Sequence, residues 1–208
     1  MKNFIILLGF LFFFGTSYGQ KPEILRPTSL IEGTLLVPNA ATNSTLAIII
    51  AGSGPTDRDG NQMMMKNNSL KFLATELYQK GISTFRYDKR IVKEMKMGTI
   101  DERKISFDSF IEDAVKIVAQ FKKDDRFEKI YLIGHSQGSL VAMIAAQEGA
   151  QGFISIAGAG QPIDYVVVDQ LAQQAPGLKD NARAAFDELR ANGKTTSCLL
   201  YTSPSPRD

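Results

Sequence analysis

The stretch Ile130-Tyr131-Leu132-Ile133-Gly134-His135-Ser136-Gln137-Gly138-Ser139-Leu140-Val141 decides the fold of this chain. Its first four residues are mostly apolar and β-prone, and the pattern becomes helical from Ser139 to Gln147. A strand, a sharp turn and a helix with a serine at the apex match the Gly-x-Ser-x-Gly pattern of a nucleophile elbow. The alternative is an ordinary tight turn with a bystander serine. Because a strand precedes the turn and an amphipathic helix follows it, we favour the elbow.

The residues around Ser136 fit this interpretation. Such a turn forces its serine into a strained backbone conformation, so the residues two positions away must be nearly free of side chain, and these are Gly134 and Gly138. The following helix directs its free N–H groups and the positive end of its dipole toward the serine. A negative charge that develops there during acyl transfer would be stabilised. Ser136 is therefore the candidate nucleophile.

Length and composition limit the possible functions. The chain has 208 residues, enough for one domain with a sizeable core, and 44% of them are hydrophobic and 22% charged. The net charge is +2 and no basic block occurs, so nucleic acid is not an expected partner. One cysteine excludes an internal disulfide and any thiolate metal cluster. We expect no metal and no other cofactor.

The N-terminus is typical of a secretory signal peptide over residues 1–19. Lys2 supplies the positive charge, Phe4 to Phe14 form an apolar run, and Ser17-Tyr18-Gly19 resembles a cleavage site. An uncleaved anchor is the alternative, but the run is shorter than the ~20 residues of a spanning helix. We expect a secreted or periplasmic protein with no membrane span after cleavage.

The C-terminus departs from the rest of the sequence. Residues 198–208 contain the single cysteine and look like a sequencing adapter that was translated in frame. The alternative is a natural tail rich in serine and proline. We expect the native sequence to stop near Ser197 and the natural protein to continue beyond that point.

Strands alternate with helices along the chain, which predicts an α/β fold with a mainly parallel sheet and flanking helices. The expected strands lie within 23–38, 45–51, 82–87, 130–133 and 152–157, and the expected helices at 69–79, with Ser69 as its cap, 106–121 and 139–147. The run 45–51 is apolar throughout, as in a strand buried on both faces. The charged segment 88–104 is predicted to be a surface loop. Residues 20–160 would form the N-terminal part of an incomplete domain, and two helices within 161–197 would begin a cap.

These features resemble the α/β-hydrolase fold. More narrowly, Gly52-Ser53-Gly54-Pro55-Thr56-Asp57-Arg58-Asp59-Gly60-Asn61 and Arg86-Tyr87-Asp88-Lys89-Arg90 look like secreted bacterial hydrolases of the serine aminopeptidase-like (S33) group, many of which are called esterases. The resemblance covers residues 23–197. It implies a small-molecule ester or a peptide-like amide as substrate and leaves the substrate itself and the oligomeric state open.

The resemblance implies roles for three residues. Ser136 would attack an acyl carbonyl and form an acyl-enzyme, which water then hydrolyses. In this fold one oxyanion donor is the N–H of the residue after the nucleophile, here Gln137, and the other comes from the loop after the third strand, here Ser53. A flexible turn or a phosphate loop is the alternative for the Gly52 to Gly54 segment. Pro55 lacks an N–H and no phosphate-binding motif follows, which disfavours nucleotide binding.

A serine nucleophile needs a base, which is usually a histidine held by a carboxylate and follows the serine in this fold. The single histidine here, His135, precedes Ser136. Adjacent residues at a strand end point to opposite sides, so we expect His135 to pack beneath the elbow as a core residue. The acid and base would then lie beyond Ser197. A non-catalytic binding module on the same scaffold is the alternative function.

Four further groups receive structural interpretations. We expect residues 57–59 to form a solvated loop with Asx-turns, Asp88 to make a structural ion pair, and Asp164 to cap a helix rather than serve as a triad acid. The three methionines 63–65 are expected to fill an apolar gap rather than to bind a metal.

Overall fold

The computed structural model describes residues 21–38, 44–101 and 104–196. The predicted signal peptide at 1–19 and the adapter-like segment at 198–208 lie outside these residues. The strands are β1 (Glu23–Leu25), β2 (Gly33–Leu36), β3 (Ser44–Ile50), β4 (Ser83–Tyr87), β5 (Phe127–His135) and β6 (Gly152–Ile156). The helices are α1 (Ser69–Gln79), α2 (Arg90–Met97), α3 (Phe107–Phe121), α4 (Gln137–Ala145), α5 (Ile163–Gln174) and α6 (Lys179–Asn192), with short 3₁₀ turns η2 (Ala146–Glu148) and η3 (Pro176–Leu178).

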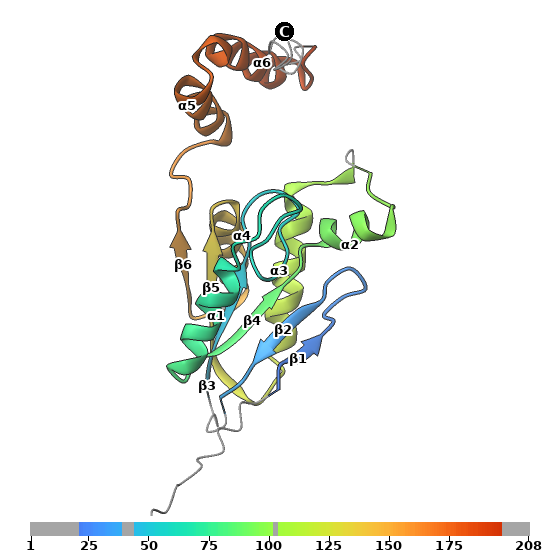
Figure 1. Ribbon diagram of the computed structural model, residues 1–208, viewed down its shortest axis with the longest axis vertical. Helices are drawn as coiled ribbons and strands as arrows, with labels where there is room; N and C mark the ends of the chain where they lie inside the picture. Colours follow the sequence, from blue (N-terminus) through green and yellow to red (C-terminus); the bar gives the residue numbers. More distant parts are fainter. Residues whose placement is uncertain (1–20, 39–43, 102–103, 197–208) are drawn as a thin grey trace, which may run out of the picture.

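The six strands form one sheet in the order β1-β2-β4-β3-β5-β6 (Figure 1). Strands β4, β3, β5 and β6 are parallel neighbours, and the β1–β2 hairpin adds to β4 in antiparallel fashion. The strand–helix alternation between β3 and β6 explains this arrangement, since parallel neighbours require a crossover connection. The predicted mainly parallel sheet with flanking helices is confirmed.

Strand β3 lies at the centre and is buried on both faces, as its apolar run predicted. Every residue from Leu46 to Ile50 is at most 3% exposed. Alternate side chains serve two cores: Leu46, Ile48 and Ile50 pack against α3 and α4, and Ala47 and Ile49 pack against α1. The strand is therefore held from both layers.

Helix α2 corrects the sequence prediction, which gave the segment 88–104 as a loop. Val92 is the only buried residue of this eight-residue helix, so it lacks the wide apolar stripe by which the longer helices were recognised. Gly98 ends it with φ 67°, in the left-handed region.

Helix α1 also differs from the prediction at its start. Asn68 rather than Ser69 is its N-cap, and Asn68 makes no side-chain cap bond.

The register of the central strands brings three connections to one edge of the sheet. Ile49 is paired with both Arg86 in β4 and Ile133 in β5, and Ile50 with Gly134. Because parallel strands end at the same edge, the loop after β3, the start of α2 and the turn after β5 meet there. This edge carries the candidate site.

Strand β6 ends the sheet among the described residues and exposes apolar side chains. Phe153, Ile154 and Ile156 are 42%, 50% and 37% exposed. Beyond it, α5 and α6 pack against each other and stand apart from the sheet (Figure 1). Across the described ranges, no helix has the length and apolarity needed to cross a membrane.

Candidate functional site

The predicted elbow is present, with Ser136 at its apex. Strand β5 ends at His135, α4 begins at Gln137, and Ser136 between them has φ 53° and ψ −120°. A non-glycine residue with positive φ is uncommon and stores conformational strain. The surrounding structure must therefore hold this residue in place.

Both glycines of the elbow are needed for close backbone packing. A Cβ on Gly134 would lie 2.1 Å from the carbonyl oxygen of Gly138, and one on Gly138 would lie 2.4 Å from that of Ile50. The backbone of the turn therefore packs closely against itself and against the end of β3. This is the reason for the Gly-x-Ser-x-Gly spacing.

The strained serine is also tied to β6. The Ser136 N–H donates to the carbonyl oxygen of Ile156 at 2.9 Å. The Ser139 hydroxyl donates to the carbonyl oxygen of Gly134 at 2.7 Å and approaches that of Ile156 at 3.3 Å. Sequence reasoning did not single out Ser139, which links the helix to both strands.

The loop after β3 lies against the elbow. A Cβ on Gly52 would be 3.3 Å from Ser136 Cβ and 3.0 Å from His135 Nδ1, so only a residue without a side chain allows this approach without displacement. The Ser53 N–H has no acceptor among the described residues. The Gln137 N–H opens α4 and has no acceptor within the helix. The structure therefore brings all three predicted site residues to the same edge of the sheet.

Hydrogen bonds fix the shape of the loop beside Ser53. The Ser53 carbonyl oxygen accepts from the Thr56 hydroxyl at 3.0 Å and from Gln62 Nε2 at 3.1 Å. Further along, Asp57 Oδ1 accepts from the N–H groups of Asp59 and Asn61 at 2.9 and 2.8 Å. The predicted Asx-turn is confirmed for Asp57.

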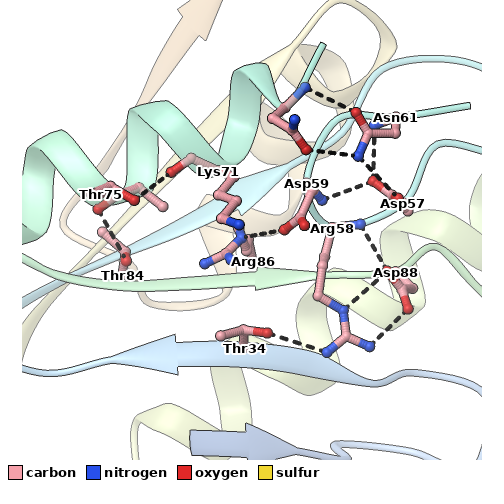
Figure 2. A network of polar contacts seen from close by, with 12 residues as sticks. Thr34, Asp57, Arg58, Asp59, Asn61, Lys71, Thr75, Thr84, Arg86 and Asp88 are labelled. Atoms are coloured by element: carbon pink, nitrogen blue, oxygen red, sulfur yellow. Dashed lines mark hydrogen bonds and ion pairs between the residues drawn. The ribbon is translucent and has the colours of Figure 1, made fainter. Parts of the chain in front are cut away.

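Arg58 anchors the loop to the sheet, as Figure 2 shows. Its guanidinium donates to Asp88 at 3.1 and 2.8 Å, to Glu32 at 2.7 Å and to Thr34 at 3.2 Å. Asp88 Oδ1 also accepts from the Arg58 N–H at 2.8 Å. The prediction of a structural ion pair for Asp88 is confirmed, but the expectation of a solvated loop is wrong for Arg58.

These contacts change the acidity of both carboxyl groups. Burial alone would raise the pKa of Asp88, but hydrogen bonds from the Arg58 side chain and backbone outweigh burial and lower it. Hydrogen bonds from Arg58 and then Arg26 lower the pKa of Glu32. Asp59, next to Arg58, accepts from Arg86 Nε of β4 at 3.0 Å and forms a second link from the loop to the sheet (Figure 2).

Lys89 is a buried residue at the site that sequence reasoning did not select. It immediately precedes α2, is 5% exposed, and its Nζ donates to the Gly52 carbonyl oxygen at 2.9 Å and to Gln137 Oε1 at 3.0 Å. Burial lowers the pKa of its ammonium group to about 8. Its position two residues after a buried strand, within the motif 86–90, was the signal that could have identified it.

The predicted placements of His135 and Asp164 are wrong. His135 is exposed and does not pack beneath the elbow, and its imidazole has no hydrogen-bond partner among the described residues. Asp164 lies inside the first turn of α5, where Pro162 is the N-cap, and accepts from Arg183 at 2.8 Å and Arg190 at 2.7 Å. It therefore joins α5 to α6.

The methionines 63–65 also differ from expectation. Met63, Met64 and Met65 are 84%, 95% and 51% exposed. Gln62 and Met65 exchange backbone hydrogen bonds of 2.8 and 3.1 Å, so the three methionines project from a tight turn rather than fill a gap.

The arrangement combines a strained serine at a helix N-terminus with two N–H groups that lack acceptors in the described chain. Such a serine is suited to attack an acyl carbon, and such N–H groups are suited to stabilise the resulting oxyanion. A base bonded to Ser136 is absent from the described residues.

Comparisons with known proteins agree with this geometry. A family model described as serine aminopeptidase, S33, matches residues 64–204. Esterase EstD of Thermotoga maritima is 30% identical over 182 residues, which cover 82% of this chain and 43% of that protein. The chain thus spans less than half the length of this curated relative.

Two solved structures share the fold at low sequence identity. A dienelactone hydrolase from Anabaena variabilis has a TM-score of 0.51 and 21% identity, covering 74% of this chain and 69% of that chain. Est1E from Butyrivibrio proteoclasticus has a TM-score of 0.51 and 20% identity, with coverage of 71% and 54%. Because the family model matches more than half of the chain and the sheet carries the expected elbow, this chain belongs to the serine aminopeptidase (S33) family of α/β-hydrolases.

Proposed function

We propose that the protein is a serine hydrolase in which Ser136 forms an acyl-enzyme with a small-molecule ester or a peptide-like amide. The observation that carries the proposal is the backbone of Ser136, held at φ 53° where β5 meets α4. The esterase name of the Thermotoga relative supports an ester. The peptidase description of the family keeps a peptide-like amide as the alternative substrate.

In the proposed reaction, Ser136 Oγ bonds to the acyl carbon while its proton passes to a general base. The carbonyl oxygen becomes an oxyanion that accepts from the N–H groups of Ser53 and Gln137. The leaving alcohol or amine then takes the proton, and water, deprotonated by the same base, releases the acid and regenerates the serine.

We propose that the base is a histidine outside the 208 residues. His135 is the single histidine of the chain, and it precedes Ser136, whereas the base follows the serine in this fold. The exposed apolar residues of β6 and the partial coverage of the Thermotoga esterase are compatible with further structure on that side of the sheet. We also propose that the protein is secreted or periplasmic, on the pattern of residues 1–19, and that α5 and α6 form part of a cap.

A fluorophosphonate probe tests the nucleophile in the full-length gene product. We expect the probe to label the wild-type protein and not the Ser136→Ala variant, because the probe bonds covalently to an activated serine. Ser53→Ala is the matched control, since it removes a hydroxyl from the same site and keeps the backbone N–H. Labelling that survives Ser136→Ala would overturn the proposal.

A second experiment separates the enzyme from a binding module that kept the fold without a base. We expect the 208-residue chain to hydrolyse p-nitrophenyl butyrate at no more than the rate of its Ser136→Ala variant, because the base is not in it. The full-length product should show Ser136-dependent hydrolysis. Its absence would favour the binding module, and Ser136-dependent turnover by the 208 residues alone would contradict our placement of the base.

A further inference from the structure

Packing alone does not explain why Lys89 is buried. Its ammonium group is buried and donates two hydrogen bonds to neutral oxygens, on Gly52 and on the side chain of Gln137. The Nζ atom also lies 4.4 Å from the centre of the Phe110 ring. Burying a cation is costly unless it is both paired with an opposite charge and hydrogen-bonded, so this placement needs a reason.

Carboxylates near Lys89 are engaged elsewhere. Asp113, on the facing helix α3, lines the same small pocket but accepts from Arg90 at 2.7 Å through each of its two oxygens. Asp88, the preceding residue, is held by Arg58. Within the described chain Lys89 therefore forms no ion pair, and its ammonium group contacts the loop after β3, α4 and the Phe110 ring.

The bond to Gly52 fixes the direction of a proposed oxyanion donor. The Gly52 carbonyl and the Ser53 N–H belong to one peptide group, which is planar and trans, so the two point in opposite directions. A donor that holds the oxygen on one side orients the N–H to the other side. A hydrogen bond to the oxygen also polarises the peptide group and strengthens its N–H as a donor.

The second hydrogen bond of Lys89 is to Gln137, the residue whose N–H is the second proposed oxyanion donor. Gln137 supplies its N–H from the start of α4, while its side-chain oxygen accepts from Lys89 at 3.0 Å. One ammonium group therefore holds both the peptide group of the first donor and the residue of the second.

We propose that Lys89 is a positioning residue of the oxyanion hole, which aligns the N–H groups of Ser53 and Gln137 by bridging the Gly52 carbonyl and the Gln137 side chain. The inference rests on the proposed function of Ser136. It adds that the two donors are set by one buried lysine between β4 and α2.

The test compares Lys89→Met with the wild type in the full-length protein, using p-nitrophenyl butyrate. Methionine keeps the length and apolar stem of lysine and removes the donors. We expect kcat to fall about 10- to 100-fold with KM changed less than about twofold, because loss of one oxyanion donor costs ~10²–10³-fold. The inhibition constant of phenylboronic acid, which forms a tetrahedral adduct on the serine, should rise by a similar factor.

Lys93→Met is the matched control. Lys93 also donates to a backbone carbonyl oxygen, that of Ser29 at 2.7 Å, but from the exposed side of α2. We expect its kcat and its boronate inhibition constant to equal those of the wild type.

Gln137→Met supplies an independent variant, since it removes the 3.0 Å bond and leaves the backbone N–H in place. We expect kcat to fall several-fold, and the double variant with Lys89→Met to lose less than the product of the two single losses. If Lys89→Met does not fold, Gln137→Met carries the test alone. The role of Lys89 would be overturned if every folded variant kept the wild-type kcat and boronate inhibition constant while hydrolysis still depended on Ser136. Hydrolysis that survives Ser136→Ala would instead overturn the proposed function.

Discussion

Gly134→Ala is expected to lower the free energy of unfolding by at least about 3 kcal/mol. The added Cβ would lie 2.1 Å from the carbonyl oxygen of Gly138, 2.4 Å from its carbonyl carbon and 2.5 Å from Ser139 Cα. All three are backbone atoms, so no side chain can rotate to make room. The turn would have to open, and Ser136 would leave its strained conformation.

Urea denaturation of the purified variant measures this effect, with Gly160→Ala as the control. Gly160 has a φ outside the left-handed region, and a Cβ added to it would meet no heavy atom within 4 Å, so alanine there should change stability by less than about 1 kcal/mol. A Gly134→Ala variant that unfolds within about 1 kcal/mol of the wild type would show that the elbow relaxes more easily than its close contacts indicate.

The parts of the fold that the sequence predicted are those with short-range patterns. The apolar run 45–51 indicated the central strand, and the spacing of two glycines around Ser136 indicated the elbow. Helix α3 was indicated by its apolar stripe; the cap from the Ser106 side chain was not predicted. Each pattern reflects a local physical requirement, either burial on a face or room for backbone, that acts at a fixed residue spacing.

The parts that were missed depend on partners distant in the sequence. Nothing near Lys89 indicates that it meets Gly52 and Gln137, which lie 37 and 48 positions away. The charged helix α2 has a single buried residue and so resembled a loop. His135 was expected inside because adjacent residues at a strand end point to opposite sides, and the methionines 63–65 because they could fill an apolar gap. The structure leaves all four exposed, at a strand end and in a tight turn.

Arg58→Met is expected to lower the free energy of unfolding by roughly 3 kcal/mol near neutral pH. The variant leaves the mostly buried carboxylate of Asp88, whose side chain is 13% exposed, without its guanidinium partner. It also removes the bonds that join the loop to Thr34 in β2 and to Glu32, the residue before that strand. Breaking one side of such a pair costs more than the pair contributes, because a desolvated charge remains.

Two comparisons isolate this mechanism by urea denaturation. Arg126 bonds to Asp124 and Glu23 through a side chain that is 40% exposed, so Arg126→Met should cost no more than about 1 kcal/mol. Adding Asp88→Leu to Arg58→Met should recover part of the loss, with a coupling energy of at least about 1 kcal/mol. Strict additivity of the two changes would argue against a buried ion pair.

The pH dependence of stability tests whether Arg58 acts through its charge. Because Arg58 lowers the pKa of Asp88 and of Glu32 in the folded protein, from ordinary values of 3.8 and 4.5, the unfolded chain binds more protons in that range. This stabilisation is fully present above the ordinary values and is lost as the pH falls through the folded pKa values. The difference in unfolding free energy between wild type and Arg58→Met should therefore be constant from about pH 6 to 7 and shrink below about pH 4. A difference that persists unchanged into acid would mean that Arg58 stabilises the loop by packing its stem rather than by its charge.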